Sequence, residues 1–237
     1  MATNVPDISI VIPALNEREN LELLLPLLSE VVSTLNLKSE IIIADGGSAD
    51  GTAEFAEQQG AQVVLQSERG YGGALLAGFA RARAAYVVTM DADLSHPPVF
   101  LRDFWQQRAT AEMLIASRYI AGGKADMGPS RRVLSAVLNK TYARVLDLPL
   151  ADLSSGFRLY HRDILEKLEL QSRDFDVLEE ILVKVHLLGA RIKEVPFHYQ
   201  ARNSGKSHAK LLKFGWAFVR TLVRMRRLRN TARVLKK

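Results

Sequence analysis

The 237-residue sequence contains no cysteine, which excludes disulfide bonds, thiol nucleophiles and zinc sites built from cysteine. It also lacks the patterns G-x-G-x-x-G and G-x-x-x-x-G-K-[ST], so dinucleotide-dependent oxidoreductases and P-loop ATPases are disfavoured. Residues 1–7 lack the basic start and apolar stretch of a signal peptide, and we expect none. The longest uncharged run of the C-terminal segment, Phe214 to Val219, is far shorter than the roughly 18 apolar residues of a membrane span.

Acidic residues are absent from the C-terminal segment. Residues 202–237 contain twelve lysines or arginines and no aspartate or glutamate, whereas the whole chain has 32 basic and 26 acidic residues. The first 201 residues therefore hold 20 basic and 26 acidic side chains, and the formal net charge of +6 arises in the tail. Such asymmetry is typical of a terminal segment that contacts a polyanion, either nucleic acid or an anionic membrane.

Apolar runs rich in β-branched residues alternate with helical patterns through the first half of the chain. The pattern predicts strands over 8–12, 40–44, 62–66, 86–90 and 113–117, and helices over 20–35, 52–59, 74–84 and 98–109. This alternation predicts an α/β fold with a mostly parallel sheet and helices on both faces. We expect ligands at the carboxyl ends of the strands.

The second half of the chain has a less regular pattern. We expect a loop over 121–129, helices over 131–146 and 177–188, and strands over 157–160 and 191–197. No linker separates a second folded domain, so we expect one catalytic domain over 1–208. Residues 209–237 mix apolar and basic side chains and predict a basic amphipathic helix.

Two aspartates, Asp91 and Asp93, follow the apolar run that ends at Thr89. In an extended backbone alternate side chains share a face, so both carboxylates would point the same way. Two hard oxygen donors in this arrangement suit Mg²⁺ or Mn²⁺, with a diphosphate and water at the other positions. The alternative is a turn, because aspartate favours turns and Pro97 and Pro98 follow.

Two further loops follow expected strands. In the first, Asp45 could hydrogen-bond a nucleotide base, and Asp50 is expected to be the N-cap of the next helix. In the second, the glycines between Glu68 and Gly73 could contact a phosphate, although alone they predict this weakly.

Ordered motifs identify a resemblance. Pro13-Ala-Leu-Asn-Glu17, Asp45-Gly-Gly-Ser-Ala-Asp-Gly-Thr52, Gly70-Tyr-Gly-Gly-Ala74 and Asp91-Ala-Asp-Leu-Ser-His-Pro97 resemble, in this order, the inverting family-two glycosyltransferases with the GT-A fold. Ser117-Arg-Tyr119, Ser155-Gly-Phe-Arg-Leu-Tyr160, Glu194-Val-Pro196 and Arg202-Asn-Ser-Gly-Lys-Ser207 resemble their dolichol- or polyprenyl-phosphate mannosyltransferase branch. The resemblance covers about residues 8–207.

The resemblance implies roles for particular residues. It assigns the nucleotide pocket to Pro13, Asn16, Glu17, Asp45, Asp91 and Ala92, and the metal, Mg²⁺ or Mn²⁺, to Asp91 and Asp93. It assigns the acceptor phosphate to Arg118, Arg131, Arg158, Arg202 and Ser207, with Arg118, Arg131 and Arg202 also counted as catalytic. Arg158 could instead pair with Asp152 or Asp163. The sequence departs from the family at Gly46, where a second acidic residue is common, and at His208, where lysine is usual.

The implied reaction moves a sugar from a nucleoside-diphosphate sugar to a polyprenyl or dolichyl phosphate with inversion. GDP-mannose is the favoured donor, with UDP-glucose as the alternative. A phosphate acceptor is largely ionised at neutral pH and needs no strong base. A hydroxyl acceptor would require a carboxylate base, for which Asp152, Glu179 and Glu180 are available, although we expect Glu180 to orient an arginine. A non-catalytic scaffold is a third hypothesis.

The basic tail is expected to bind a membrane surface. Phe214, Trp216 and Phe218 would lie at the headgroup level, and Arg220 and Arg224 would contact anionic lipid. We therefore expect a cytoplasmic protein held peripherally on the inner face of the membrane. Nucleic acid is the alternative partner, but the sequence contains no recognisable nucleic-acid-binding module, and we expect none to bind.

Overall fold

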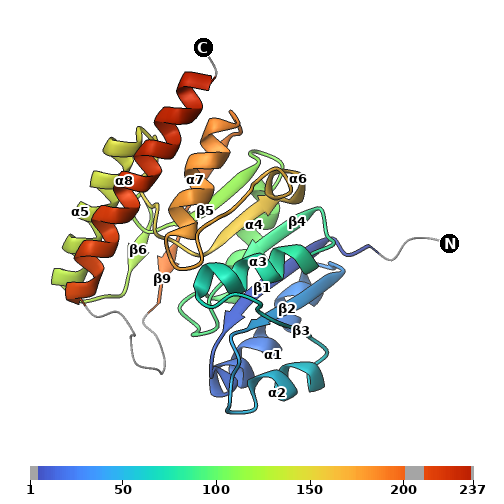
Figure 1. The fold of residues 1–237 in the computed structure, drawn as a ribbon. Helices are drawn as coiled ribbons and strands as arrows, with labels where there is room; N and C mark the ends of the chain where they lie inside the picture. Colours follow the sequence, from blue (N-terminus) through green and yellow to red (C-terminus); the bar gives the residue numbers. More distant parts are fainter. Residues whose placement is uncertain (1–4, 201–210, 236–237) are drawn as a thin grey trace.

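A central sheet of seven strands organises the molecule (Figure 1). The computed structural model describes residues 5–200 and 211–235, and for 211–218 and 232–235 it describes the backbone alone. The strand order is β3 (Gln62–Leu65), β2 (Ser39–Asp45), β1 (Ile8–Ala14), β4 (Tyr86–Thr89), β7 (Arg158–His161), β5 (Met113–Ser117) and β8 (Ile192–Pro196). Only β7 runs antiparallel to its neighbours within this sheet, so the predicted mostly parallel α/β sheet is confirmed.

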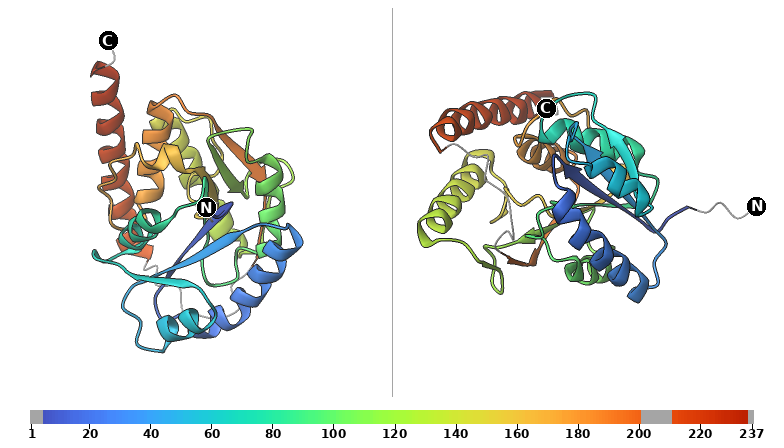
Figure 2. Two further views of the ribbon diagram at one scale, coloured as in Figure 1. Left: turned by 90° about the vertical axis from the view of Figure 1, so that its right-hand side faces the viewer. Right: turned by 90° about the horizontal axis from the view of Figure 1, so that it is seen from below.

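Helices cover both faces of the sheet (Figure 2). On one face lie α1 (Arg18–Thr34), α2 (Thr52–Gln58), the 3₁₀ turn η1 (Pro98–Phe100) and α4 (Leu101–Gln107). On the other face lie α3 (Tyr71–Arg81), α5 (Pro129–Leu146), α6 (Arg162–Leu165), α7 (Val177–Leu187) and α8 (Leu211–Leu235). The single helix expected over 98–109 is thus a 3₁₀ turn followed by a helix, and α3 begins three residues earlier than expected.

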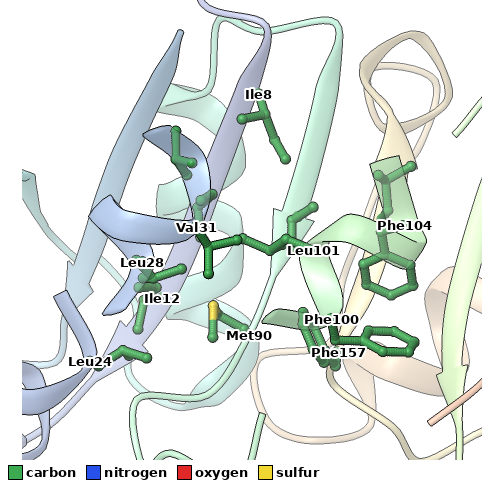
Figure 3. Packing of buried hydrophobic residues seen from close by; sticks show 14 of the residues in the cluster. Ile8, Ile12, Leu24, Leu28, Val31, Met90, Phe100, Leu101, Phe104 and Phe157 are labelled. Carbon is green, nitrogen blue, oxygen red and sulfur yellow. The ribbon is translucent and has the colours of Figure 1, made fainter. Parts of the chain in front are cut away.

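The helices are held against the sheet by apolar side chains that recur along one face of each helix. In the cluster shown in Figure 3, Leu24 and Leu28 of α1 meet Ile12 of β1, while Phe104 of α4 packs near Phe157. All five are almost completely buried. Removing such area from water contributes about 25 cal/mol per Å², which fixes the helices against the sheet.

The second half of the chain contains three elements that the sequence did not predict, of which the four-residue helix α6 is one. β6 (Lys124–Ala125) lies within the expected loop and pairs in parallel with β9 (His198–Tyr199) to form a second, two-stranded sheet. Elements of two residues are too short to show a period. Over residues 5–200 and 211–235, no helix has the length and hydropathy needed to cross a membrane.

The C-terminal helix α8 packs against α5 and α7, and the views in Figures 1 and 2 show it alongside α5. Two arginines of α8 point inward: Arg224 pairs with acidic residues of α7, and Arg229 pairs with Asp147 after α5. Arg224 was expected to contact lipid; its side chain pairs with Asp176 and Glu180 at the start of α7 and is 42% exposed, so lipid contact stays a prediction. The proposed boundary at residue 208 lies outside the residues that the structure describes.

A buried carboxylate ties together the amino ends of the strands, at the edge of the sheet opposite to the polar loops. Glu40 of β2 is almost fully buried and accepts hydrogen bonds from the Ser9 hydroxyl (2.6 Å), the Arg83 N–H (2.6 Å) and Arg83 Nε (2.9 Å). Burial alone would raise the pKa of Glu40, but these bonds outweigh it and lower the pKa below its usual value of 4.5.

We predict that Glu40→Gln lowers the free energy of unfolding by about 2 kcal/mol at pH 7, because a charged acceptor of three hydrogen bonds is lost. The pKa of Glu40 is lowered in the folded state, so its contribution is complete above about pH 4.5 and is lost as the pH falls further. Urea denaturation at a series of pH values from 7 to 3 should show that the difference in free energy of unfolding between Glu40→Gln and wild type shrinks as the pH falls. Glu166→Gln, in an exposed pair, serves as the control. A difference in free energy of unfolding that is the same at every pH would contradict the prediction.

Candidate functional site

The carboxyl ends of β1, β2 and β4 meet at one edge of the sheet. Ala14 lies beside Asp45, and Val11 lies beside Thr89 in the parallel register. The loops that follow these three strands are therefore neighbours, although the sequence separates them by about 30 and 45 residues. This edge is the expected place for a ligand in a mostly parallel sheet.

Hydrogen bonds join the first two loops. The Asn16 N–H donates to Ser48 Oγ (2.8 Å), and the Ala49 N–H donates to Asn16 Oδ1 (2.9 Å). The Glu17 N–H donates to Thr52 Oγ1 (3.0 Å). Asn16 has φ +56°, a left-handed conformation that asparagine tolerates better than most residues. The two loops form one platform next to Pro13, at the place predicted for the nucleotide.

Asp45 shapes its own loop. Its carboxylate is buried and accepts the N–H groups of Gly47 and Ser48 (3.0 Å each) and the Ser48 hydroxyl (2.5 Å). Since each carboxylate oxygen has two lone pairs, Oδ1 retains one further acceptor position. Asp50 is not the N-cap as expected: that position belongs to Gly51, and Asp50 accepts the Thr52 N–H instead (3.0 Å).

Asp91 is a partly exposed carboxylate of this edge, with 30% of its side chain accessible. Its Oδ1 accepts a hydrogen bond from the Tyr71 hydroxyl (3.3 Å), and its N–H donates to His96 Nδ1 (2.9 Å). β4 ends at Thr89, and Leu94 has φ +62°, so the segment is a sequence of bends. The expected strand geometry over residues 91–93 is therefore wrong.

Asp93 faces the interior of this turn. It is buried, and its Oδ1 accepts the Ser95 N–H (3.1 Å) and the Ser95 hydroxyl (2.5 Å). Ala92 between the two aspartates is also buried. Within the described part of the chain, no three residues of the types His, Cys, Asp and Glu gather closely enough to hold a metal by themselves. Of the two aspartates, Asp91 is thus the more accessible carboxylate, and Asp93 is the one that shapes the loop.

Tyr71 connects the glycine-rich loop to Asp91. Burial, followed by the nearby Asp91 carboxylate, raises the pKa of Tyr71 well above its usual value of 10, so its hydroxyl stays protonated and donates. Its ring stacks on Phe175 with centroids 4.7 Å apart. A Cβ at Gly156 would lie 2.6 Å from the Tyr71 hydroxyl oxygen, so only glycine leaves room for this phenol.

Close packing accounts for the glycines around Tyr71. A Cβ on Gly70 would overlap the Arg173 carbonyl oxygen, and one on Gly72 would lie 2.7 Å from the Ser172 carbonyl oxygen. Gly70 also has φ +101°, which residues with a side chain rarely adopt. These contacts explain the glycine pattern without a phosphate.

Arg118 forms a bidentate ion pair with a completely buried carboxylate. Its Nε lies 2.7 Å from Asp152 Oδ2, and its Nη2 donates to Asp152 Oδ1 and to the Ser154 hydroxyl (2.8 Å each). Burial alone would lower the pKa of Arg118, but the Asp152 carboxylate outweighs it and raises the pKa. Glu194 supports the pair by accepting the Asp152 N–H (2.9 Å). Asp152 is therefore committed to Arg118 and is a poor candidate for a general base.

Arg158 lies inside the fold. It is completely buried, and its three nitrogens donate to the carbonyl oxygens of Ser155 (2.7 Å), Leu178 (2.9 Å) and Leu153 (2.6 Å). The expected contact with an acceptor phosphate is not supported, and neither is pairing with Asp152 or Asp163. The guanidinium cross-links the start of β7 to α7.

The other candidates are spread more widely. Arg131 is exposed in the first turn of α5. Arg202 and Ser207 lie outside the described residues. Glu180 accepts the Ser172 N–H (2.7 Å) and pairs with Arg224, which confirms its expected structural role. Burial raises the pKa of Glu179 to about 7.

Sequence reasoning missed two side chains of this edge. Tyr71 received no role, although it stands between glycines in a motif that was singled out. His96 received no role either; it stacks on Phe157 (4.9 Å) and accepts the Asp91 N–H. Both contacts depend on tertiary structure, and the only local signal was the position of each residue within a motif.

Comparison with known proteins gives a consistent result. The profile of the family described as Glycosyl transferase family 2 matches residues 9–169. The dolichol-phosphate mannosyltransferase of Pyrococcus furiosus is 32% identical, over 86% of this chain and 59% of that protein. Two further relatives are also 32% identical. One is the undecaprenyl-phosphate mannosyltransferase of Micrococcus luteus, where the match covers 83% of this chain and 85% of that protein. The other is the polyprenol monophosphomannose synthase of Mycolicibacterium smegmatis, where it covers 84% of this chain and 79% of that protein. The chain thus spans under two thirds of the archaeal relative.

Solved structures show the same architecture. Glucosyl-3-phosphoglycerate synthase of Mycobacterium tuberculosis, in complex with Mn²⁺, UDP-glucose and phosphoglyceric acid, superposes with a TM-score of 0.71. This match covers 93% of this chain and 80% of that one at 22% identity. A second structure of the same enzyme, in complex with Mn²⁺, UDP and phosphoglyceric acid, superposes with a TM-score of 0.70. The sequence match over most of the chain and the shared architecture lead to one conclusion. This chain belongs to glycosyl transferase family 2 and has the GT-A fold.

Proposed function

We propose that this protein transfers mannose from GDP-mannose to a polyprenyl or dolichyl phosphate, with inversion at the anomeric carbon. One observation carries the proposal: three relatives, each 32% identical over 83–86% of this chain, are all named as mannosyltransferases or mannose synthases of polyprenol-type phosphates. The hydrogen bonds that join the loops at the edge of the sheet support a donor site there.

The donor site would use the platform after β1 and β2. Asn16 and Glu17 are fixed by the second loop, so the base would meet a preorganised surface. Asp45 retains one acceptor position, which suits an N–H of a base. Pro13 and Ala92 would line the same pocket. UDP-glucose is the alternative donor.

The donor diphosphate would be bound together with Mg²⁺ or Mn²⁺. Carboxylate oxygens are the ligands that both ions prefer, so Asp91 fits this role, and Asp93 would hold the turn that presents it. When bound, such an ion stabilises the negative charge that develops on the departing diphosphate. Tyr71 and His96 orient Asp91 through the Oδ1 and N–H contacts.

The acceptor would be a phosphate monoester, already ionised at neutral pH, so its oxygen attacks the anomeric carbon without a strong base. Arg118 is presented rigidly by Asp152 and suits a phosphate oxygen. Arg131, Arg202 and Ser207 are further proposed acceptor contacts. A hydroxyl acceptor would need a base, and of the three candidate carboxylates Asp152 and Glu180 are engaged within the fold.

A peripheral position on the cytoplasmic face of a membrane is part of the proposal, because a polyprenyl acceptor lies in a membrane. The neighbouring helices α5 and α8 expose large apolar side chains, namely Val133, Leu134, Val137, Val219 and Val223. Exposed arginines stand beside them, including Arg131 and Arg132 on α5 and Arg226 and Arg227 on α8. This combination suits an anionic lipid surface.

The direct test of the proposed function is a screen of GDP-mannose, UDP-glucose and related sugar nucleotides against short polyprenyl phosphates and a saccharide acceptor. Each reaction is run with Mn²⁺ or Mg²⁺ and with EDTA. We expect transfer from GDP-mannose to the lipid phosphate that EDTA abolishes. Transfer only to the saccharide, or no transfer from any donor, would contradict the proposal.

We predict that Asp91→Asn lowers kcat by roughly 100-fold or more, because a charged ligand worth several kcal/mol of charge stabilisation is lost. The circular dichroism spectrum should stay that of wild type, since Asp91 is partly exposed. Asp103→Asn, an exposed carboxylate of α4, is the control and should keep wild-type turnover. Near-normal turnover in Asp91→Asn would remove Asp91 from the metal site.

Arg118→Lys should raise the KM for the polyprenyl phosphate by roughly tenfold and leave the KM for the sugar nucleotide unchanged. Lysine is preferable to alanine here, because alanine would leave Asp152 buried without a counter-charge. Steady-state kinetics with each substrate varied in turn makes the comparison. Equal effects on both KM values would move Arg118 out of the acceptor site.

We predict that the double variant Arg226→Gln/Arg227→Gln binds vesicles of phosphatidylcholine and phosphatidylglycerol about 30-fold more weakly than wild type, since each basic residue contributes about 1 kcal/mol at an anionic surface. Vesicle flotation measures this, with Arg102→Gln on α4 as a control that should bind normally. Retention on single-stranded DNA at about 150 mM salt, without vesicle binding, would instead favour the nucleic-acid alternative.

A further inference from the structure

The inward side of α8 is anchored to the segment that precedes α7. Arg224 donates to the Ser172 hydroxyl and contacts two carboxylates, Asp176 Oδ2 (3.4 Å) and Glu180 Oε2 (3.3 Å). Glu180 also accepts the N–H groups of Gln171 (3.0 Å) and Ser172 (2.7 Å). Arg224 therefore completes a set of contacts that fixes the backbone of residues 171–176, which we call the support loop.

The support loop packs directly on the glycine-rich loop before α3. The Gly73 N–H donates to the Arg173 carbonyl oxygen (3.2 Å), and Arg173 forms an ion pair with Glu68. Phe175 stacks on Tyr71 with an interplanar angle of 14°. Glycines 70 and 72 let the two backbones lie in direct contact, so the position of the Tyr71 ring depends on the support loop that it stacks on.

Tyr71 in turn contacts the accessible carboxylate of the site. Its hydroxyl donates to Asp91 Oδ1 at 3.3 Å and lies close to Gly156, where a Cβ would approach it to 2.6 Å. A continuous set of contacts thus leads from Arg224 of α8 through the support loop and Tyr71 to Asp91.

We propose that Arg224 is a positioning residue that couples the docking of α8 to the affinity of the Asp91 site for a metal–nucleotide complex. This inference rests on the proposed function, since it assumes that Asp91 binds the metal of the donor complex. With α8 docked, the support loop holds Tyr71 against Asp91. With α8 displaced, Glu180 keeps its ion pair with Lys184 (2.8 Å), but Asp176 and the Ser172 hydroxyl lose Arg224. The support loop is then held less firmly, and the Asp91 carboxylate loses its fixed orientation. A membrane surface that holds α8 would then favour donor binding where the acceptor lies.

Arg229 provides a matched control on the same helix. Arg229 also anchors α8, through Asp147 Oδ2 (3.2 Å) and the Val145 carbonyl oxygen (3.2 Å), but its partners lie at the end of α5. Arg229→Gln therefore removes an anchor of α8 without touching the support loop. If Arg224 acted only by stabilising the helix, the two variants would behave alike.

The experiment measures binding of Mn²⁺ with GDP, and in parallel with UDP, to the full chain by calorimetry without vesicles or acceptor. We expect Arg224→Gln to weaken binding at least fivefold, the low end of common coupling between sites. Arg229→Gln should stay within twofold of wild type, and Arg224→Lys should recover part of the loss. Equal losses in Arg224→Gln and Arg229→Gln, or no loss in Arg224→Gln, would overturn the proposal.

A double-mutant cycle tests the route. Tyr71→Phe keeps the ring stack and removes only the hydroxyl, so it should weaken binding by itself. If Arg224 acts through Tyr71, the double variant binds no more weakly than Tyr71→Phe alone. If the fold-losses in affinity of the two single variants multiply in the double variant, the route through Tyr71 is wrong. If Arg224→Gln does not fold, Phe175→Leu replaces it in the cycle, since Phe175 is 60% exposed.

The cycle separates this inference from the proposed function. The transfer screen can fail while wild type still binds a metal–nucleotide complex, and the ratios between variants remain measurable. Conversely, wild type can transfer mannose while Arg224→Gln binds the donor complex normally, which would overturn this inference alone. Wild type that binds neither nucleotide with Mn²⁺ would overturn both.

Discussion

The parallel alignment of β1, β2 and β4 is the constraint on which the site depends. It brings three loops to one edge, and four hydrogen bonds from residues 16–18 and 49 then join the first two loops into one surface. None of these loops has a regular secondary structure that would hold it alone. Their positions are set by the buried strands beneath them, so the core and the site cannot be altered independently.

Some charged side chains of this protein are buried and stabilise the fold, whereas others are exposed and could bind a ligand. Arg158, Glu40, Asp152 and Glu180 are buried, and each is satisfied by several hydrogen bonds. Burying a charge is costly unless it is paired and hydrogen-bonded, which is why such residues come in sets. Asp91 differs because it is partly exposed and faces the edge of the sheet. A charged residue in a family motif is therefore not by itself a ligand.

The sequence predicted the sheet and its main helices because long β-branched runs and helical periods survive in a single sequence. It missed β6 and β9, which are two residues long, and α6, which is four residues long, and it placed helix boundaries up to three residues away. The direction of short polar side chains was the least predictable feature. Asp45 and Asp93 turn toward N–H groups two or three residues ahead, because aspartate readily bonds its own local backbone. The contact of Tyr71 with Asp91 joins residues 20 positions apart and has no signature in the sequence.

The central claim is that the Asp91 carboxylate holds the metal that accompanies the donor diphosphate. A crystal structure of the full chain with Mn²⁺ and GDP tests it most directly, because the anomalous signal of manganese locates the ion independently of the protein. The account predicts manganese bound to an Asp91 oxygen and to the diphosphate, with the base on the Asn16 platform. Manganese and GDP bound away from this edge, with Asp91 contacting only Tyr71 and His96, would contradict it.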